Sequence, residues 1–200
     1  MKRVRLVLVR HTQTDDDHLR ICSGTNNIRL NQRGVLQARE LADRLARFEH
    51  VRAIVTSELV RSIEVGRVIM SRCLYTQHFS SRPGLNEVNL GHHNGLPKSA
   101  IEGKSAEHPQ FNLASSVFDF RSVGGESADE VIGRFHYETE LLALEFGSLD
   151  MDDVLPRVVL VGHGTAMRLV FRDTFGLIKE LHQQGECQEV IWPPKPASSF

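Results

Sequence analysis

The 200-residue chain has few cysteines, no long hydrophobic run and almost no net charge. Its three cysteines, Cys22, Cys73 and Cys187, form no CxxC pair and no zinc-ligand spacing, which indicates reduced thiols in a cytoplasmic protein. No apolar stretch approaches the roughly 18 residues that cross a bilayer, so we expect no membrane segment. A net charge of -1 gives no electrostatic reason to expect nucleic acid as a partner.

The chain does contain alternating strand and helix patterns. Nearly continuous apolar runs at 3–9, 51–57 and 157–163 are typical of buried parallel strands. Shorter strands are expected near 76–80 and 187–192. Helical periodicity predicts helices over 31–48, 58–72, 127–147 and 164–177. The first helix is expected to face the core with Val35, Leu36, Ala38, Leu41, Ala42, Leu45 and Phe48. The alternation predicts an α/β fold, a three-layer αβα sandwich with a mainly parallel sheet.

Polar residues follow each of the three clearest strands. They are Arg10-His11, Thr56-Ser57 and Gly162-His163. Because ligands bind such sheets at the carboxyl ends of the strands, we expect both histidines to share one site at that edge.

These residue types suit phosphate chemistry. A neutral histidine is a competent nucleophile toward phosphorus, and arginine offers a fork of donors that matches phosphate oxygens. Arg10 and Arg61 are the candidate clamps, and Glu87 is a candidate general acid. The N–H groups of Gly164 and Thr165 would form an anion site where the last helix begins. Taken alone, each feature also fits a structural role: a histidine can simply end a strand, and Arg61 can be a solvated helix residue.

Seven segments in order along the chain resemble those of the histidine phosphatase superfamily, also called phosphoglycerate mutase-like. They are "LVRHTQT", "SGTNNIRLNQRGVLQA", "VTSELVRSIEVG", "LNEVNLGHHNG", "HPQF", "GGES" and "VLVGHGTAMR". The resemblance implies a phosphoglycerate mutase-like fold in one domain over residues 1–192. Residues 92–125 would be an insertion that caps the substrate site, and 193–200 a Pro-rich tail.

The resemblance also implies a role for each matching residue. His11 would become phosphorylated, while Glu87 would protonate the leaving oxygen and then help to deprotonate water. Arg10, Arg61 and His163 would bind the phosphoryl oxygens. The remaining phosphate or substrate contacts would come from Thr14, Asp17, Ser23, Gly24, Gly164 and Thr165. The family needs no metal, and we expect no cofactor.

Among the departures from the family pattern, two bear on catalysis. Asp17 stands where many members have an asparagine that donates to phosphate, and an ionised carboxylate there would repel the substrate. Thr12 stands where glycine, alanine or glutamate is usual.

The sequence therefore predicts a metal-independent phosphomonoesterase that acts on a small phosphorylated metabolite. One alternative is a phosphoglycerate mutase, although the Trp-Asn pair of mutases is replaced here by "TDDDH" and their long insertion is missing. Another is a degenerate member that binds a phosphorylated ligand without turnover, which Asp17 and Thr12 motivate. The strand at 187–192 could form the interface of a homodimer.

Overall fold

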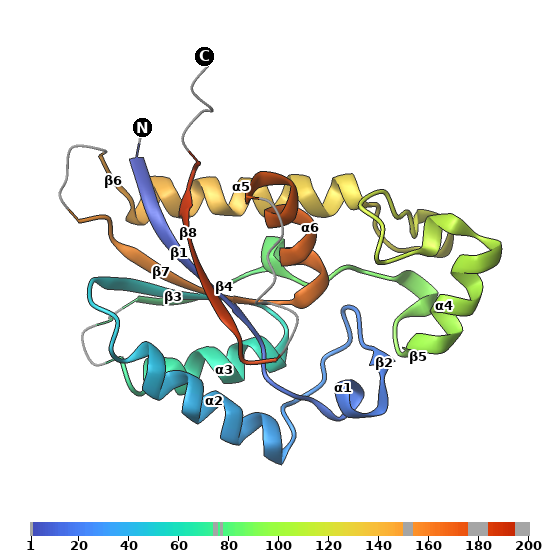
Figure 1. Cartoon of the computed structure of the whole chain (residues 1–200), viewed down its shortest axis with the longest axis horizontal. Helices are drawn as coiled ribbons and strands as arrows, with labels where there is room; N and C mark the ends of the chain where they lie inside the picture. The colour runs from blue at the N-terminus through green and yellow to red at the C-terminus, as the bar shows by residue number, and fades with distance from the viewer. Residues whose placement is uncertain (1, 74–75, 77, 150–153, 176–183, 195–200) are drawn as a thin grey trace.

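The computed structural model describes residues 2–73, 76, 78–149, 154–175 and 184–194 (Figure 1). Its centre is a six-stranded sheet in the order β4-β3-β7-β1-β6, with β8 also paired to β1. The strands are β1 (Lys2–Arg10), β3 (Val51–Ser57), β4 (His78–Arg82), β6 (Ser148–Leu149), β7 (Arg157–Gly162) and β8 (Cys187–Trp192). Strands β4, β3, β7 and β1 run parallel, while β6 and β8 are antiparallel to β1.

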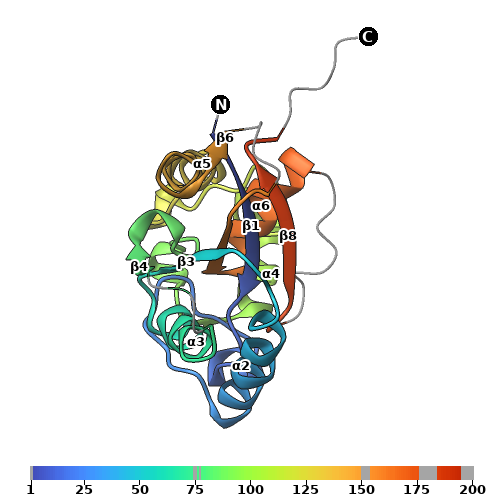
Figure 2. The same ribbon diagram turned by 90° about the vertical axis from the view of Figure 1, so that its left-hand side faces the viewer.

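Helices cover both faces of this sheet (Figure 2). The helices α2 (Gln32–Leu45) and α3 (Val60–Met70) lie on one face, and α5 (Ala128–Phe146) and α6 (Gly164–Phe175) on the other. Side chains alternate along β1, so Leu6 and Leu8 join the core under α5 and α6, while Val7 and Val9 join the core under α2 and α3. The predicted three-layer fold with a mainly parallel sheet is confirmed.

Some predicted core positions of α2 are wrong. Leu36 is 53% exposed, because the buried stripe of this helix is Gly34, Ala38, Leu41, Ala42 and Leu45. Phe48 is exposed because α2 already ends at Leu45, and its ring instead lies beneath the guanidinium of Arg157. Gly34 belongs to the stripe because a β-carbon there would collide with the carbonyl of Gln13.

A smaller layer stands beyond the carboxyl ends of the parallel strands. It contains α1 (Asp15–Leu19), α4 (Lys98–Glu107) and a two-stranded sheet of β2 (Ile21–Cys22) and β5 (Leu96–Pro97). This short sheet joins the loop after β1 to the segment predicted as a cap. Four 3-10 turns complete the layer and its approaches, at Pro83–Leu85, Gly91–His93, Pro109–Phe111 and Arg121–Val123.

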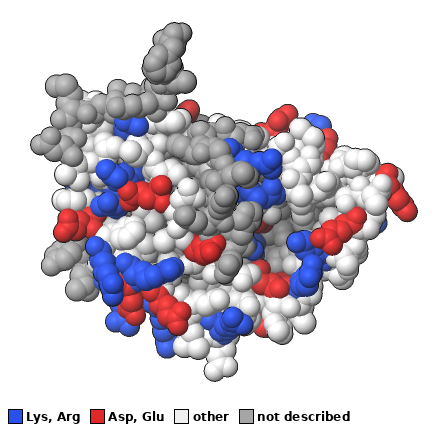
Figure 3. All heavy atoms as spheres, viewed as in Figure 1, with Lys and Arg blue, Asp and Glu red and all other residues white. Residues whose placement is uncertain are grey.

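Acidic and basic side chains are interspersed over the face seen in Figure 3. Within the described residues, every helix is too short or too polar to cross a membrane. The strand predicted at 187–192 is present as β8, which pairs with β1. The predicted homodimer stays a prediction. The predicted end of the last helix, 176–177, and the tail from 195 onward lie outside the described residues.

Candidate active site

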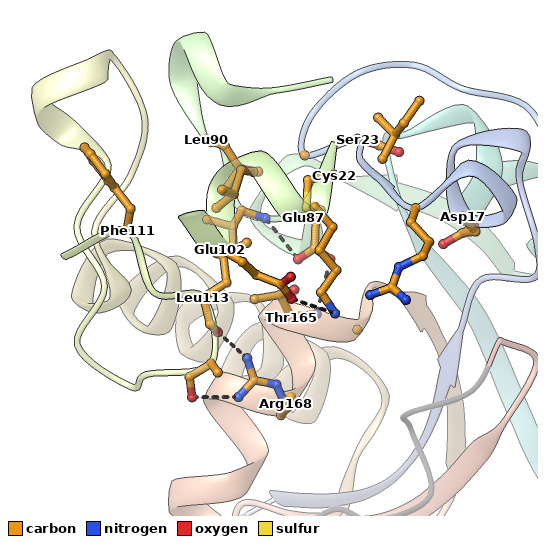
Figure 4. Close-up of a pocket in the computed structure, with 18 of the residues that line it drawn as sticks. Asp17, Cys22, Ser23, Glu87, Leu90, Glu102, Phe111, Leu113, Thr165 and Arg168 are labelled. Carbon is orange, nitrogen blue, oxygen red and sulfur yellow. Dashed lines mark hydrogen bonds and ion pairs between the residues drawn. The ribbon is translucent and has the colours of Figure 1, made fainter. Parts of the chain in front are cut away.

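A cavity of about 630 Å³ opens where the parallel strands end. Its wall combines Arg10 and His11 from the end of β1, the loop that carries Ser23 and Gly24, and Glu87 from the loop after β4. In Figure 4, Asp17 and Ser23 lie on one side, Leu90, Phe111 and Leu113 on the other, and Glu87 and Thr165 between them. Residues of the predicted cap that line the cavity are Lys98, Ile101, Glu102, Ser105, Phe111, Asn112, Leu113 and Ala114.

His11 is buried, yet its imidazole forms part of the cavity wall. Its Nδ1 lies 2.8 Å from the carbonyl oxygen of Thr12. Because a carbonyl oxygen can only accept, Nδ1 carries the proton, and the neutral ring keeps its lone pair on Nε2. The backbone thus selects the tautomer that a nucleophilic Nε2 requires.

The surroundings of His11 favour this neutral form. Burial, followed by the positive charge of Arg61, lowers the pKa of His11 from 6.5 to about 3. Arg10 lowers this pKa further, whereas the carboxylate of Asp17 raises it. A group with a depressed pKa stays unprotonated above that value, so His11 is neutral at pH 7.

We expect the His11 imidazole to remain neutral at pH 5, where a free imidazole is protonated. Two-dimensional ¹H–¹⁵N spectra of the imidazole nitrogens between pH 4 and 8 measure this directly. His11 should keep one protonated nitrogen, Nδ1, across the range, and free histidine in the same buffer serves as the control. A titration of His11 near pH 6.5 would contradict the desolvated site.

His163 lies beside His11 but does not line the cavity. The two ring centroids are 5.2 Å apart, and His163 is fully buried. Its Nε2 shares a hydrogen bond of 2.7 Å with Ser57 Oγ. Burial, with Arg61 as the next cause, lowers the pKa of His163 well below its usual value. The predicted contact between His163 and phosphoryl oxygens stays a prediction.

Arg61 is not a solvated helix residue, since it is only 2% exposed. Its guanidinium donates to the carbonyl oxygens of Asn26 and Gly24, each at 2.7 Å, and it forms part of the cavity wall. Gly24 has a φ of +51°, and a β-carbon there would collide with the side chain of Asn94. Glycine is therefore required where this loop meets the arginine.

Arg10 is the second cation of the cavity wall. Its guanidinium packs against Gly164, where an added β-carbon would meet Arg10 Cζ at 3.0 Å. Its Nη2 lies 4.0 Å from Asp17 Oδ1. Two arginines thus approach His11 from different elements, one from β1 and one from α3.

Glu87 occupies the anion site that the sequence predicted at the start of α6. Its Oε1 accepts from the N–H groups of Val88 at 3.0 Å and Ala166 at 2.9 Å. Its Oε2 accepts from the N–H of Thr165 at 3.2 Å. At the start of α6 the N–H groups of Thr165 and Ala166 thus hold the carboxylate of Glu87 at the cavity, and the predicted contact of Gly164 and Thr165 with a substrate anion stays a prediction.

The polar residues after His11 have divided roles. Thr14 is buried, and its hydroxyl caps α1 by accepting from the N–H of Asp17, so its predicted contact with the substrate stays a prediction. Asp17 does line the cavity, and its Oδ2 accepts from the N–H and hydroxyl of Thr14. Its carboxylate is therefore part of a capping box as well as a charge near Arg10. Ser23 lines the cavity and donates to Asp16.

Sequence reasoning missed Ser57 as the partner of His163 and three further cations in the cavity wall, Arg20, Lys98 and Arg168. Arg168 had a usable signal: it follows Gly164 by four residues, so both lie on the same face of α6. Its Nη2 donates to the carbonyl of Leu113 at 2.5 Å, which ties α6 to the cap (Figure 4). No signal in the sequence placed Arg20 or Lys98 there, because both come from the small layer whose folding was not predicted.

Comparison with known proteins identifies the family. The model of the histidine phosphatase superfamily (branch 1) matches residues 6–190. The chain belongs to this superfamily. The probable phosphoglycerate mutase GpmB of Salmonella paratyphi A is 29% identical over 177 residues, which cover 87% of this chain and 76% of that protein. The phosphoglycerate mutase-like protein 4 of Arabidopsis thaliana is 27% identical over 168 residues, which cover 83% and 69%.

Solved structures share the fold. A mycobacterial glucosyl-3-phosphoglycerate phosphatase in complex with VO3 superposes with a TM-score of 0.71 and 25% identity, covering 88% of this chain and 82% of that one. YhfR of Bacillus stearothermophilus has a TM-score of 0.72 at 19% identity, covering 93% and 90%. At this identity, the similarity to YhfR is evidence for the fold alone.

Over the described part of the chain, histidine, cysteine and carboxylate side chains do not gather in groups of three or more that could hold an ion. The charged groups of the wall are arginines, Lys98 and carboxylates, and they share this wall with His11.

Proposed function

We propose that the chain is a metal-independent phosphomonoesterase that hydrolyses a small phosphorylated metabolite through a phosphohistidine intermediate. One observation carries the proposal. A neutral histidine, His11, whose Nδ1 is held by the Thr12 carbonyl, lines a cavity whose wall also contains Arg10, Arg61 and Glu87. A nucleophile, a clamp for oxyanions and an acid are the groups that phosphoryl transfer requires.

In the first step, the Nε2 lone pair of His11 attacks phosphorus, and the bond between phosphorus and the leaving oxygen breaks. The leaving oxygen takes a proton from the carboxyl group of Glu87. Arg10 and Arg61 bind the equatorial oxygens as charge develops on them, and the burial of both side chains strengthens this interaction. The Nδ1–H bond to Thr12 stabilises the imidazole as it becomes positive.

In the second step, a water molecule attacks phosphorus in line with the P–Nε2 bond. The carboxylate of Glu87 takes the proton from this water, the P–N bond breaks, and His11 returns to its neutral form with inorganic phosphate as the product. The same group thus acts as acid and then as base.

The cavity supports a small substrate. Its volume of about 630 Å³ lies in the ordinary range for metabolite sites. The mycobacterial neighbour is named as a phosphatase of glucosyl-3-phosphoglycerate, which supports hydrolysis of a phosphorylated metabolite here. Two curated relatives carry phosphoglycerate mutase names, so transfer to a second hydroxyl is the competing function.

Trapping the phosphoenzyme tests the proposal. The protein, treated with EDTA, is mixed with p-nitrophenyl phosphate and denatured at alkaline pH, where phosphohistidine survives. We expect phosphate on His11 by mass spectrometry, and steady release of inorganic phosphate in the presence of the chelator. Label at another residue, or activity lost with EDTA and restored by a divalent metal, would contradict the mechanism. Phosphate passed mainly to an added phosphoglycerate rather than to water would identify a mutase.

A further inference from the structure

The loop that carries Glu87 is held by one side chain of α5. Arg134 Nη1 donates to the carbonyl oxygens of Gly84 and Asn86, each at 2.8 Å, and Nη2 donates to the carbonyl of Glu87 at 3.2 Å. The remaining N–H groups donate to the carboxylate of Glu126, from Nε at 2.8 Å and from Nη2 at 3.1 Å. All five donors of the guanidinium are therefore in use.

Glu126 binds the same loop on the other side of Glu87, at Asn89. Its Oε2 accepts from the N–H of Asn89 at 2.8 Å, and its own N–H donates to the carbonyl of Asn89. Glu126 lies in the "GGES" segment, to which the sequence assigned no chemistry. Together, the Arg134–Glu126 pair fixes the backbone before, at and after the residue that bears the carboxyl group.

The pair does not take part in the cavity wall. Glu87 holds its backbone carbonyl toward Arg134 and its carboxylate toward the start of α6. A shift of the loop would therefore move the carboxylate relative to the phosphorus without altering the clamp of Arg10 and Arg61, which comes from β1 and α3.

We propose that the Arg134–Glu126 ion pair is a positioning device that places the Glu87 carboxyl group for proton transfer to the leaving oxygen. The inference rests on the proposed function. Proton transfer needs a donor within hydrogen-bond reach, so a displacement of about 1 Å is costly. The rate therefore falls only for substrates whose leaving group needs this proton.

This dependence on the leaving group separates positioning from a general structural role. p-Nitrophenol departs readily as an anion, whereas a simple alkyl alcohol must be protonated as it leaves. We expect Arg134→Lys to lower kcat/KM for an alkyl phosphate by about 10-fold or more and for p-nitrophenyl phosphate by less than about 2-fold. Lysine keeps the charge but cannot span three carbonyls and a carboxylate. Glu126→Gln should change the two substrates in the same unequal way.

Matched variants complete the test. Arg157→Lys breaks an ion pair with Glu189 at the start of β7, the end of the strand opposite the cavity. The two pairs have similar exposure: the side chains of Arg134 and Glu126 are 21% and 22% exposed, and those of Arg157 and Glu189 are 22% and 27% exposed. Arg157→Lys should not change the ratio between the substrates. Glu87→Gln should show the unequal loss in its strongest form.

Each outcome decides a different point. Equal losses on both substrates in the Arg134 and Glu126 variants, or the unequal loss in Arg157→Lys, would overturn the positioning role alone. Equal losses in Glu87→Gln would overturn Glu87 as the acid, and the positioning role with it. A wild-type protein that hydrolyses neither substrate would overturn the proposed function itself.

Discussion

Replacing His11 with asparagine is expected to lower kcat/KM for p-nitrophenyl phosphate by roughly 10⁴-fold or more, because a nucleophile that forms a covalent intermediate has no substitute in the site. Asparagine is chosen because its amide can still donate to the Thr12 carbonyl that now binds Nδ1. The fold should therefore survive while the attacking lone pair is lost. Initial rates with EDTA present, together with thermal unfolding, measure both effects.

His18→Asn is the matched control, since the same change is made on an exposed residue of α1 outside the cavity wall. It should retain the wild-type rate. Undiminished hydrolysis in the His11 variant would contradict the covalent mechanism, whereas loss of phosphate binding along with the rate would indicate that the variant disturbs the pocket.

Arg61→Met is expected to lower kcat/KM by roughly 10²- to 10³-fold, because the variant removes a preorganised donor for charge that develops on the phosphoryl oxygens. It should also lower the free energy of unfolding by roughly 1–3 kcal/mol, since the carbonyls of Gly24 and Asn26 lose their donor. Kinetics and urea denaturation measure the two losses separately. Arg61→Lys should recover part of the stability but little of the rate, because an ammonium cannot form the same fork.

Arg67→Met provides the control on the same helix, where the side chain is exposed and lies outside the cavity wall. Both its rate and its stability should match the wild type. If Arg61→Met lost stability but kept full activity, Arg61 would be a support for the loop at 24–26 and not a phosphate ligand.

The losses of activity expected for the His11 and Arg61 variants have one electrostatic origin. Burial and the charges of Arg61 and Arg10 hold the pKa of His11 at about 3, so the imidazole stays neutral beside two cations. A bound phosphate dianion would offset the arginines and favour positive charge on the ring. The arrangement therefore keeps the nucleophile unprotonated before binding and stabilises the cationic ring during transfer.

Local sequence was sufficient for the parts of the fold that follow from periodicity. The apolar runs of β1, β3 and β7 specified parallel strands, and the polar residues after them specified an edge where His11 and His163 would meet, as their ring separation of 5.2 Å shows. Phe48 shows the limit of periodicity, because the pattern continued past the residue where the helix ends.

By itself, the sequence determined the α/β class, the superfamily and the residue types gathered at the strand ends, because strand and helix periods and short ordered motifs are local properties. Only the tertiary structure decided which groups face the cavity. It buried Arg61 against the carbonyls of Gly24 and Asn26, and it filled the start of α6 with the carboxylate of Glu87. It also brought Arg134 to the loop about fifty residues before it. Such contacts join residues far apart in the chain, and no local pattern encodes them.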